Sequence, residues 1–210
     1  MTARTTPPFR ADHVGSFLRP KYLLDAREQF FVKKEITAAQ LRAVEDKAIT
    51  EIVKFQQDVG LQSITDGEFR RTYFHIDFLE QLGGVKTDIP VTIRKPDGTE
   101  ELAPPVMRVV GKVEHVKDIQ RADFEYLKSQ VAAGLTPKVT IPSPTMLHFR
   151  GGRKSISQAV YPDMDGYFED LGKLYQKAIR AFYEAGCRYL QLDDITFAYL
   201  CDPKIQENCR

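Results

Sequence analysis

Acidic and basic side chains crowd residues 66–71, which read Asp-Gly-Glu-Phe-Arg-Arg and directly follow a short apolar segment at residues 61–64. Gly60 suits the left-handed end of a helix, so the apolar segment is typical of a buried strand that follows a helix. Ligands of parallel α/β folds bind at the carboxyl ends of such strands. The charged residues therefore either line a site or form a polar turn in which the arginines pair with the acids.

The same order of helix end, glycine, apolar strand and polar residues occurs twice more. Residues 186–194 read Gly-Cys-Arg-Tyr-Leu-Gln-Leu-Asp-Asp, and residues 134–143 end in Ile-Pro-Ser. A first strand is predicted over residues 9–14, with His13 near its end. Strands whose polar ends lie on the same side would form one pocket, which favours a site over a polar turn.

Helical patterns separate these strands. Thr37 and Gln40 have capping-box spacing, and apolar residues then recur every three or four positions over residues 41–59. Further helices are predicted over residues 119–133 and 167–185, with a short helical turn at 21–24, and further strands over 107–113, 138–141 and 189–192. Strands that alternate with helices predict a parallel sheet.

Two segments interrupt this alternation. Residues 84–105 contain a Pro-Asp-Gly turn signal between short runs, which predicts an inserted hairpin or loop. Residues 142–163 form a long polar connection, and such connections are often functional. Residues 1–8 are expected to form a loose tail, and residues 9–210 the N-terminal part of a TIM-barrel domain.

The predicted fold class is α/β, a partial (β/α)8 TIM barrel made of its first five strands. No G-x-G-x-x-G motif follows the first strand, so a dinucleotide-binding fold has no support. A complete barrel has eight strands and about 250 residues, whereas this chain has 210 residues. A five-stranded parallel sheet has two unpaired edges, so we expect self-association or pairing with the missing barrel half.

Composition argues against several classes of partner. The net charge is +1, with 42% hydrophobic and 28% charged residues, which gives no electrostatic case for nucleic acid or a membrane surface. No apolar run approaches the roughly 20 residues of a membrane span. The first residues contain no apolar signal core, which predicts a cytoplasmic protein. The three cysteines form no C-x-x-C pair, so reduced thiols are expected.

Four motifs, taken in order, resemble the catalytic barrel of cobalamin-independent methionine synthase, and most closely its short single-barrel bacterial relatives. They are His-Val-Gly-Ser at 13–16, Asp-Gly-Glu-Phe-Arg at 66–70, Pro-Ser-Pro-Thr at 142–145 and Gln-Leu-Asp-Asp at 191–194. The resemblance covers nearly the whole chain. It implies a methyltransferase that moves a methyl group from a folate-type donor to the thiol of homocysteine, with a zinc ion that binds the thiolate.

The resemblance also implies roles for matching residues. Gly15 and Ser16 correspond to the turn whose N–H groups hold the carboxylate of the amino acid, and Glu68 and Asp193 correspond to the acids that hold its ammonium group. A zwitterion suits donors at one end and carboxylates at the other. The other pocket candidates are His13, Asp66, Arg70, His148, Arg150 and Asp194.

The chain departs from the family at the metal site. The family's zinc ligands include a His-x-Cys pair on strands after the fifth, and residues 1–210 contain no such pair. We therefore expect no metal site in this chain and, in an intact protein, zinc ligands beyond residue 210. Catalytic residues stay unassigned.

Other functions stay open. Methionine synthase ends its fifth strand in Asp-Glu-Pro, whereas residues 193–195 here read Asp-Asp-Ile. The chain could thus belong to a barrel relative that uses another thiol or methyl donor, or to a non-catalytic amino-acid-binding module. His148 and Arg150 would lie in a solvated basic loop or in a lid that contacts an anionic substrate such as a methylfolate.

Overall fold

The computed structural model describes residues 4–88, 92–94, 98, 100–102, 105–149, 151–199, 201–203 and 207. The chain divides into two compact units. The first unit contains residues 1–71, 120–140 and 182–191, and the second contains residues 72–119, 141–181 and 192–210. That residues 9–210 form the N-terminal part of a TIM-barrel domain stays a prediction.

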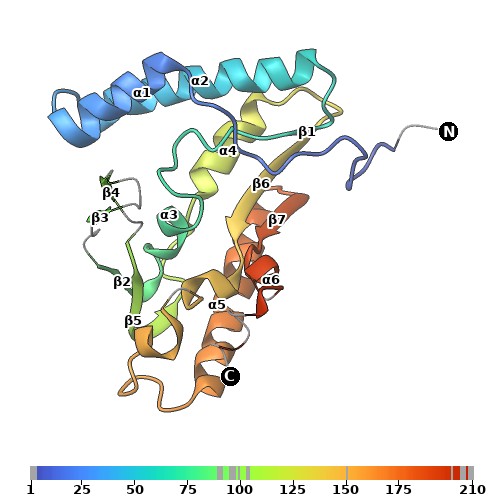
Figure 1. The fold of residues 1–210 in the computed structure, drawn as a ribbon. Helices are drawn as coiled ribbons and strands as arrows, with labels where there is room; N and C mark the ends of the chain where they lie inside the picture. Colours follow the sequence, from blue (N-terminus) through green and yellow to red (C-terminus); the bar gives the residue numbers. More distant parts are fainter. Residues whose placement is uncertain are drawn as a thin grey trace. The chain divides into compact units, whose positions relative to one another are not determined.

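Two helical stretches begin the first unit and lie side by side (Figure 1). Helix α1 (Lys21–Glu28) continues into a π-helical turn, η1 (Gln29–Lys33), and α2 (Ala38–Asp58) follows. The predicted capping box is confirmed: the Gln40 N–H donates to Thr37 Oγ1 over 3.3 Å, and the Thr37 N–H donates to Gln40 Oε1 over 2.8 Å. These bonds satisfy N–H groups that the first helical turn leaves without partners, so α2 starts at a defined residue.

The parallel sheet has the strand order β1-β6-β7. Strand β1 (Ser63–Ile64) pairs in parallel with β6 (Thr136–Pro142), and β7 (Tyr189–Asp193) is the other neighbour of β6. The mixed α/β fold with a parallel sheet is confirmed, as are these three predicted strands. Ser63 and Ile64 pair with Thr136 and Pro137 at the start of β6, so the turn that follows β1 lies beside the later part of β6, where Thr140 contacts Glu68.

The strand predicted over residues 9–14 is wrong. The structure assigns no strand to these residues, and the only β-pairing near them is a single parallel bridge between Ser16 and Gly67. Side-chain hydrogen bonds, described below, hold this segment in place of a backbone ladder. The partial (β/α)8 barrel of the sequence prediction therefore stays a prediction.

The core of the first unit lies between α1, α2, β1 and α4 (Arg121–Gln130), the helix predicted over residues 119–133. Burial of each large side chain contributes about 1.5–3 kcal/mol to the free energy of unfolding. The fully buried members of this core are Leu23, Ala48, Ile49, Val53, Ile64, Phe69 and Leu127. Phe69 directly follows Glu68 within the charged turn, so the core anchors the segment that carries Glu68.

The second unit contains an antiparallel pair of strands. Strand β2 (Gly83–Thr87) pairs with β5 (Met107–Glu114), with an irregular register between Gly83 and Val85. At Gly84, φ is +76° and a Cβ would lie 2.2 Å from the Lys112 carbonyl oxygen, so only glycine fits there. The predicted strand at 107–113 is thus confirmed, but its expected place in the parallel sheet is wrong, since its partner is β2.

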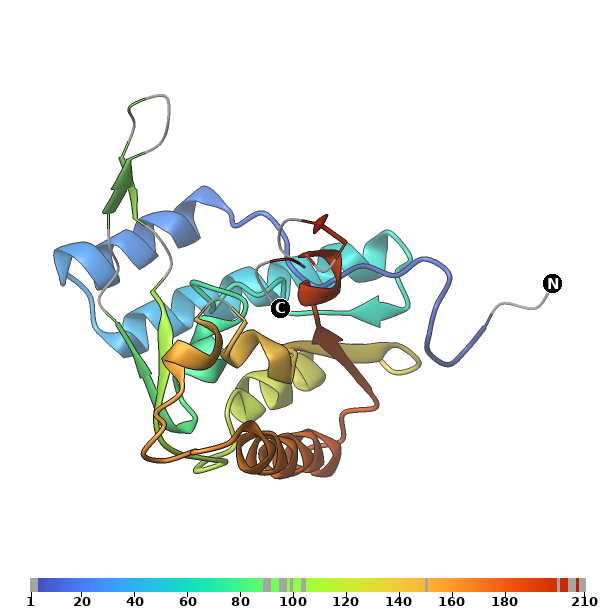
Figure 2. The same ribbon diagram turned by 60° about the horizontal axis from the view of Figure 1, so that its bottom comes forward.

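The predicted insertion at residues 84–105 forms a hairpin in the residues that the structure describes. Strands β3 (Thr92–Arg94) and β4 (Glu100–Leu102) pair antiparallel and lie beyond the β2–β5 pair (Figure 2). Gly98 lies between them with φ +86°, which suits a tight turn. The remaining residues of the insertion lie outside the described residues.

Helices complete the second unit. They are α3 (Ile76–Leu79), the 3-10 turns η2 (Pro144–Leu147) and η3 (Gly152–Ser155), α5 (Met164–Glu184), which is the helix predicted over 167–185, and α6 (Thr196–Tyr199). Tyr161 and Tyr167 are buried, and their rings meet edge to face with centroids 5.5 Å apart. The long connection between β6 and α5 therefore packs as folded structure. Within the described residues, no helix is long and apolar enough to cross a membrane.

Candidate functional site

The charged turn after β1 holds Glu68 in an uncommon backbone conformation. Gly67 has φ +70° and Glu68 has φ +58°. A left-handed conformation costs a residue with a Cβ roughly 1–2 kcal/mol, a cost that glycine avoids. The Glu68 N–H donates to Asp66 Oδ1 over 2.9 Å, which stabilises this turn. Backbone strain of this kind is concentrated at functional sites.

The Glu68 carboxylate is buried, with 6% of the residue exposed. Thr140 Oγ1 donates to Glu68 Oε1 over 2.8 Å, and Arg71 Nη1 lies 3.5 Å from the same oxygen. Arg71 also donates to the Thr140 carbonyl oxygen over 2.6 Å, which fixes its guanidinium group. In the described part of the chain only Oε1 accepts hydrogen bonds, so Oε2 can accept one from a ligand.

Gly15 lies directly against this carboxylate. A Cβ on Gly15 would lie 3.3 Å from both Glu68 Oε1 and Thr140 Oγ1, and the φ of Gly15 is +151°. Any side chain here would crowd the carboxylate. The sequence thus places a bare backbone beside Glu68.

Contacts with Thr65 and Gly67 fix the turn at Gly15 and Ser16. Thr65 Oγ1 donates to the Gly15 carbonyl oxygen over 2.6 Å. Ser16 forms its bridge with Gly67, and the Phe17 N–H donates to the Gly67 carbonyl oxygen over 3.1 Å. The structure therefore brings together three of the four residues predicted to bind substrate: Gly15, Ser16 and Glu68.

Arg70 points away from this turn. Its guanidinium group lies 2.6 Å from Asp46, 3.0 Å from Asp123 and 3.7 Å from Glu45, and it stacks over the Tyr126 ring. The expected pairing of Arg70 with the acids of its own turn is wrong, whereas that of Arg71 with Glu68 is confirmed. Burial raises the pKa of Glu45, and the nearby Arg70 opposes that rise. Arg70 is therefore part of an ion network that joins α2 to α4.

A second polar cluster, the Asp12 cluster, lies in the same unit and was not foreseen. It comprises Asp12, His13, Ser63, Lys138 and Tyr189. Lys138 Nζ lies 3.2 Å from both carboxylate oxygens of Asp12, and its side chain is 0% exposed. Ser63 Oγ donates to Asp12 over 2.7 Å, and the Tyr189 hydroxyl also donates to Asp12. A lysine inside the apolar strand at 138–141 was the sequence signal for this cluster.

His13 belongs to this cluster through both its backbone and its ring. Lys138 donates to the His13 carbonyl oxygen. The His13 Nε2 atom lies 3.3 Å from the Ser63 carbonyl oxygen, and the ring packs edge to face on Phe17, with centroids 5.1 Å apart. His13 thus contacts Ser63, the first residue of β1, whereas the turn at residues 15–16 contacts Glu68.

In the second unit, Asp194 lies two residues before α6, which begins at Thr196. The Thr196 N–H donates to Asp194 Oδ1 over 2.9 Å, and Thr145 Oγ1 donates to Oδ2 over 3.3 Å. Burial alone would raise the pKa of Asp194, but these bonds outweigh it and lower the pKa. The Asp193 carbonyl oxygen accepts from the Ser143 N–H over 2.9 Å. The role of Asp193 beside Glu68 stays a prediction.

His148 packs inside the second unit. Its Nδ1 atom lies 3.1 Å from the Tyr167 hydroxyl, and its ring meets those of Tyr167 and Phe168 edge to face. Burial lowers the pKa of His148, so the neutral imidazole is favoured. These contacts do not fit the solvated basic loop predicted from the sequence, and they make His148 part of a folded aromatic cluster. Arg150 lies outside the described residues.

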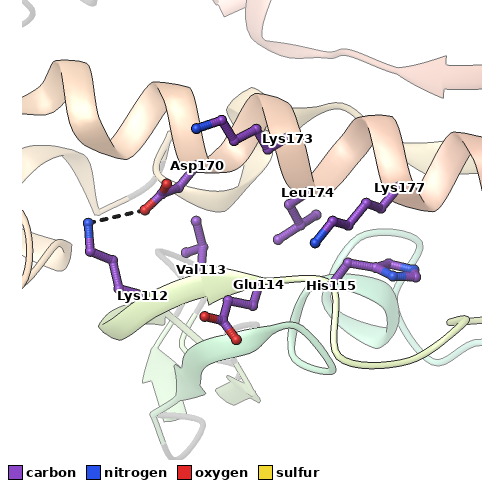
Figure 3. Close-up of a pocket in the computed structure, with 8 residues that line it drawn as sticks. All are labelled: Lys112, Val113, Glu114, His115, Asp170, Lys173, Leu174 and Lys177. Carbon is purple, nitrogen blue, oxygen red and sulfur yellow. Dashed lines mark ion pairs between the residues drawn. The ribbon is translucent and has the colours of Figure 1, made fainter.

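A cavity of about 460 Å³ lies between β5 and α5 (Figure 3). Its polar lining carries both signs of charge: Lys112, Glu114, His115, Asp170, Lys173 and Lys177. Lys112 lies 3.2 Å from Asp170, and Lys173 lies 2.6 Å from Glu169. Because acids already neutralise two of the three ammonium groups, the cavity has no strong preference for an anion.

Comparisons with known proteins identify the family of this chain. Residues 9–202 match the family described as cobalamin-independent synthase, catalytic domain. The chain is 44% identical over 203 residues to the uncharacterised protein YxjH of Bacillus subtilis, which covers 97% of the chain and 52% of YxjH. It is 30% identical over 181 residues to a methionine synthase of Sulfurisphaera tokodaii, which covers 86% of the chain and 50% of that protein.

A solved structure is also similar. A Listeria monocytogenes protein, described as a candidate vitamin-B12-independent methionine synthase, superposes with a TM-score of 0.79 at 44% identity, over 96% of this chain and 58% of the other. The chain therefore belongs to the cobalamin-independent synthase family, in its catalytic domain. It spans about half the length of the curated relatives it matches.

Proposed function

We propose that this chain supplies the amino-acid-binding part of a methyltransferase that moves a methyl group from a folate-type donor to the thiol of homocysteine, giving methionine. One observation carries the proposal: the buried Glu68 carboxylate lies against the bare backbone of Gly15. The Glu68 oxygen Oε2 can receive a ligand's ammonium group. The N–H groups at Gly15 and Ser16 are then candidate donors to its carboxylate. Family membership supports the same reaction class.

In this proposal the protein positions the acceptor. Glu68, with Asp193 as the second predicted acid, fixes the ammonium end, and the turn at residues 15–16 fixes the carboxylate end. The thiol then lies at a defined distance from both. During transfer, the sulfur–carbon bond forms as the donor nitrogen–carbon bond breaks; the thiol gives up its proton, and the donor nitrogen keeps the electron pair of the broken bond and takes up one proton. Such orientation lowers the entropic part of the activation barrier.

Zinc does not fit the described residues of this chain. Among them, no three or more His, Cys, Asp or Glu side chains are grouped so as to hold a metal ion. No step of the proposal therefore uses a metal ligand from these residues. We propose that zinc ligands of an intact protein come from the part of the relatives that this chain does not match.

The direct test is methionine formation from L-homocysteine and 5-methyltetrahydropteroyltriglutamate. We expect the 210-residue chain alone to form none. A protein extended over the full length of the relatives should form methionine, and Glu68→Gln in that protein should raise the KM for homocysteine. Asp58→Asn, on the exposed face of α2, is the matched control. An extended protein that leaves homocysteine unmethylated would refute the proposal.

The sequence identities to the relatives leave a second function open. The 44% identity to the uncharacterised YxjH exceeds the 30% identity to the S. tokodaii methionine synthase. The acceptor could thus be another thiol, the donor could be another methyl compound, or the chain could bind an amino acid without catalysis. A panel of thiol acceptors, assayed with the extended protein and a labelled methyl donor, separates these alternatives.

A further inference from the structure

We propose that the ion pair between Asp12 and the fully buried ammonium group of Lys138 positions the turn at Gly15 and Ser16 for amino-acid binding, which makes both charged residues positioning residues. The inference rests on the function proposed above for that turn. It adds a role for two residues that none of the comparisons and none of the sequence motifs assigned.

The first argument is that residues 9–14 lack the usual support of a strand. The structure assigns them no β-ladder, and the first bridge is at Ser16. The Asp12 cluster is what fixes the segment. Asp12 receives bonds from Ser63, Lys138 and Tyr189, which lie on all three strands of the sheet.

The second argument is geometric. Residues two apart on a strand point to the same face, about 6.6–6.8 Å apart. Lys138 and Thr140 are such a pair on β6, while Thr65 directly follows β1, two residues after Ser63. The first of each pair bonds to Asp12, while Thr65 bonds to Gly15 and Thr140 to Glu68. The Asp12 cluster is therefore one layer below the amino-acid site along β6.

The third argument concerns charge. The Lys138 side chain is fully buried, and Asp12 is its ion-pair partner among the described residues. A buried charge that loses its partner is strongly unfavourable, so the lysine ammonium group would move or draw water into the layer. Lys138 also donates to the His13 carbonyl oxygen, so any such movement would reach the backbone two residues before Gly15.

The ring of Tyr189 completes the layer. Lys138 Nζ lies 4.9 Å from the centroid of that ring, and the same tyrosine donates its hydroxyl proton to Asp12. Phe9 is buried, and its ring packs edge to face on Tyr189 at 6.4 Å. Charge, hydroxyl and ring contacts thus fix the segment at both Phe9 and Asp12.

Hydrogen exchange of the backbone amides is the test, with Asp12→Asn and Lys138→Met as variants of the 210-residue chain. We expect exchange at residues 13–17 to accelerate by about tenfold or more, because local opening becomes easier. Exchange in α2 (Ala38–Asp58) should stay within about twofold. Asp12→Glu keeps the charge and should retain most of the protection. Lys54→Met, which breaks an exposed ion pair on α2, is the matched control.

Amino-acid binding provides the second readout. An L-homocysteine titration followed by NMR should give a dissociation constant about fivefold or more higher for Asp12→Asn than for the wild type. Tyr189→Phe removes one bond to Asp12 and keeps the ring, so it should give a smaller change in the same direction. That variant decides the question if Asp12→Asn does not fold.

Two results would overturn the inference. One is unchanged exchange at residues 13–17 in the variants. The other is equal acceleration in α2, which would show general destabilisation. If wild-type protein binds no homocysteine, the proposed function fails, and the exchange data still decide whether the ion pair holds the turn.

Discussion

At the scale of single residues, the candidate site depends on the carboxylate of Glu68, a residue with a strained backbone conformation. Glu68 has a left-handed φ of +58°, and its Oε1 atom accepts from Thr140. A glycine before it and a glycine beside it make that position possible: Gly67 turns the chain, and Gly15 leaves room for the carboxylate. Each glycine is needed for a distinct physical reason.

Gly67→Ala should destabilise the protein more than Gly60→Ala. Both glycines have positive φ, so each alanine costs about 1–2 kcal/mol of backbone strain. At Gly67 the new Cβ would also lie 2.9 Å from the buried Phe69 ring, whereas at Gly60 nothing lies within 4 Å. Overpacking adds about 1–3 kcal/mol. Urea unfolding measures both variants, and equal losses would contradict the clash.

Asp12→Asn should change how the free energy of unfolding depends on pH. The polar bonds and Lys138 outweigh desolvation and lower the pKa of Asp12 from 3.8 to about 2. The ionised carboxylate therefore stabilises the fold fully above pH 3.8, and that contribution is lost as the pH falls towards 2. The difference in unfolding free energy between wild type and variant should shrink over that range. A difference that stays constant with pH would contradict this origin.

The sequence predicted some site residues and missed others. Gly15, Ser16 and Glu68 follow from motifs that are contiguous along the chain. Thr140 and Asp12 could not be found that way, because their partners are more than 50 positions away and meet only in the fold. Arg70 was misplaced for the same reason, since its acids lie on α2 and α4.

At the scale of elements, periodicity was a good guide to helices and a poor one to strand pairing. Helix α2 starts at its capping box, and α5 has the predicted apolar face. The segment at residues 9–14 has strand-like composition, yet side chains hold it in place of a ladder. The sequence predicted strand β5 but not its antiparallel pairing with β2. The register of that pair is irregular between Gly83 and Val85, which hydrophobic patterns do not reveal.

Arg70→Met should weaken the junction between α2 and α4 without weakening amino-acid binding. Removal of one member of a buried ion network costs about 3 kcal/mol, and Arg70 is 7% exposed beside Asp46 and Asp123. Lys21→Met, in an exposed pair, should change the unfolding free energy by less than about 0.5 kcal/mol. Chemical denaturation and a homocysteine titration measure the two effects. A large loss of affinity for homocysteine in a folded Arg70→Met protein would contradict this expectation and indicate that Arg70 contributes to the pocket.

At the scale of the whole molecule, the chain matches about half of its relatives' length. In the described residues the parallel sheet has β1 and β7 at its edges. Unpaired strand edges attract further strands. Large apolar side chains are also exposed in the first unit, among them Val14, Leu18, Phe55 and Val59. These features favour pairing with a further polypeptide.

We expect the chain to associate, either with a second copy or with a polypeptide that supplies the unmatched half of its relatives. Sedimentation velocity of the chain alone and with that polypeptide measures this. Leu18→Lys places a charge on a side chain that is 97% exposed, and it should weaken the association. A cooperatively folded monomer that ignores the added polypeptide would contradict the expectation.

The central claim is that Glu68 recognises the ammonium group of an amino acid. The most direct measurement compares L-homocysteine with its deamino analogue, 4-sulfanylbutanoate, by titration of wild type and Glu68→Gln. Wild type should prefer homocysteine by about tenfold or more, because a hydrogen bond between charged groups contributes about 1.5–3 kcal/mol. Glu68→Gln should lose that preference and bind the analogue as wild type does. Equal preference in both proteins would contradict the claim.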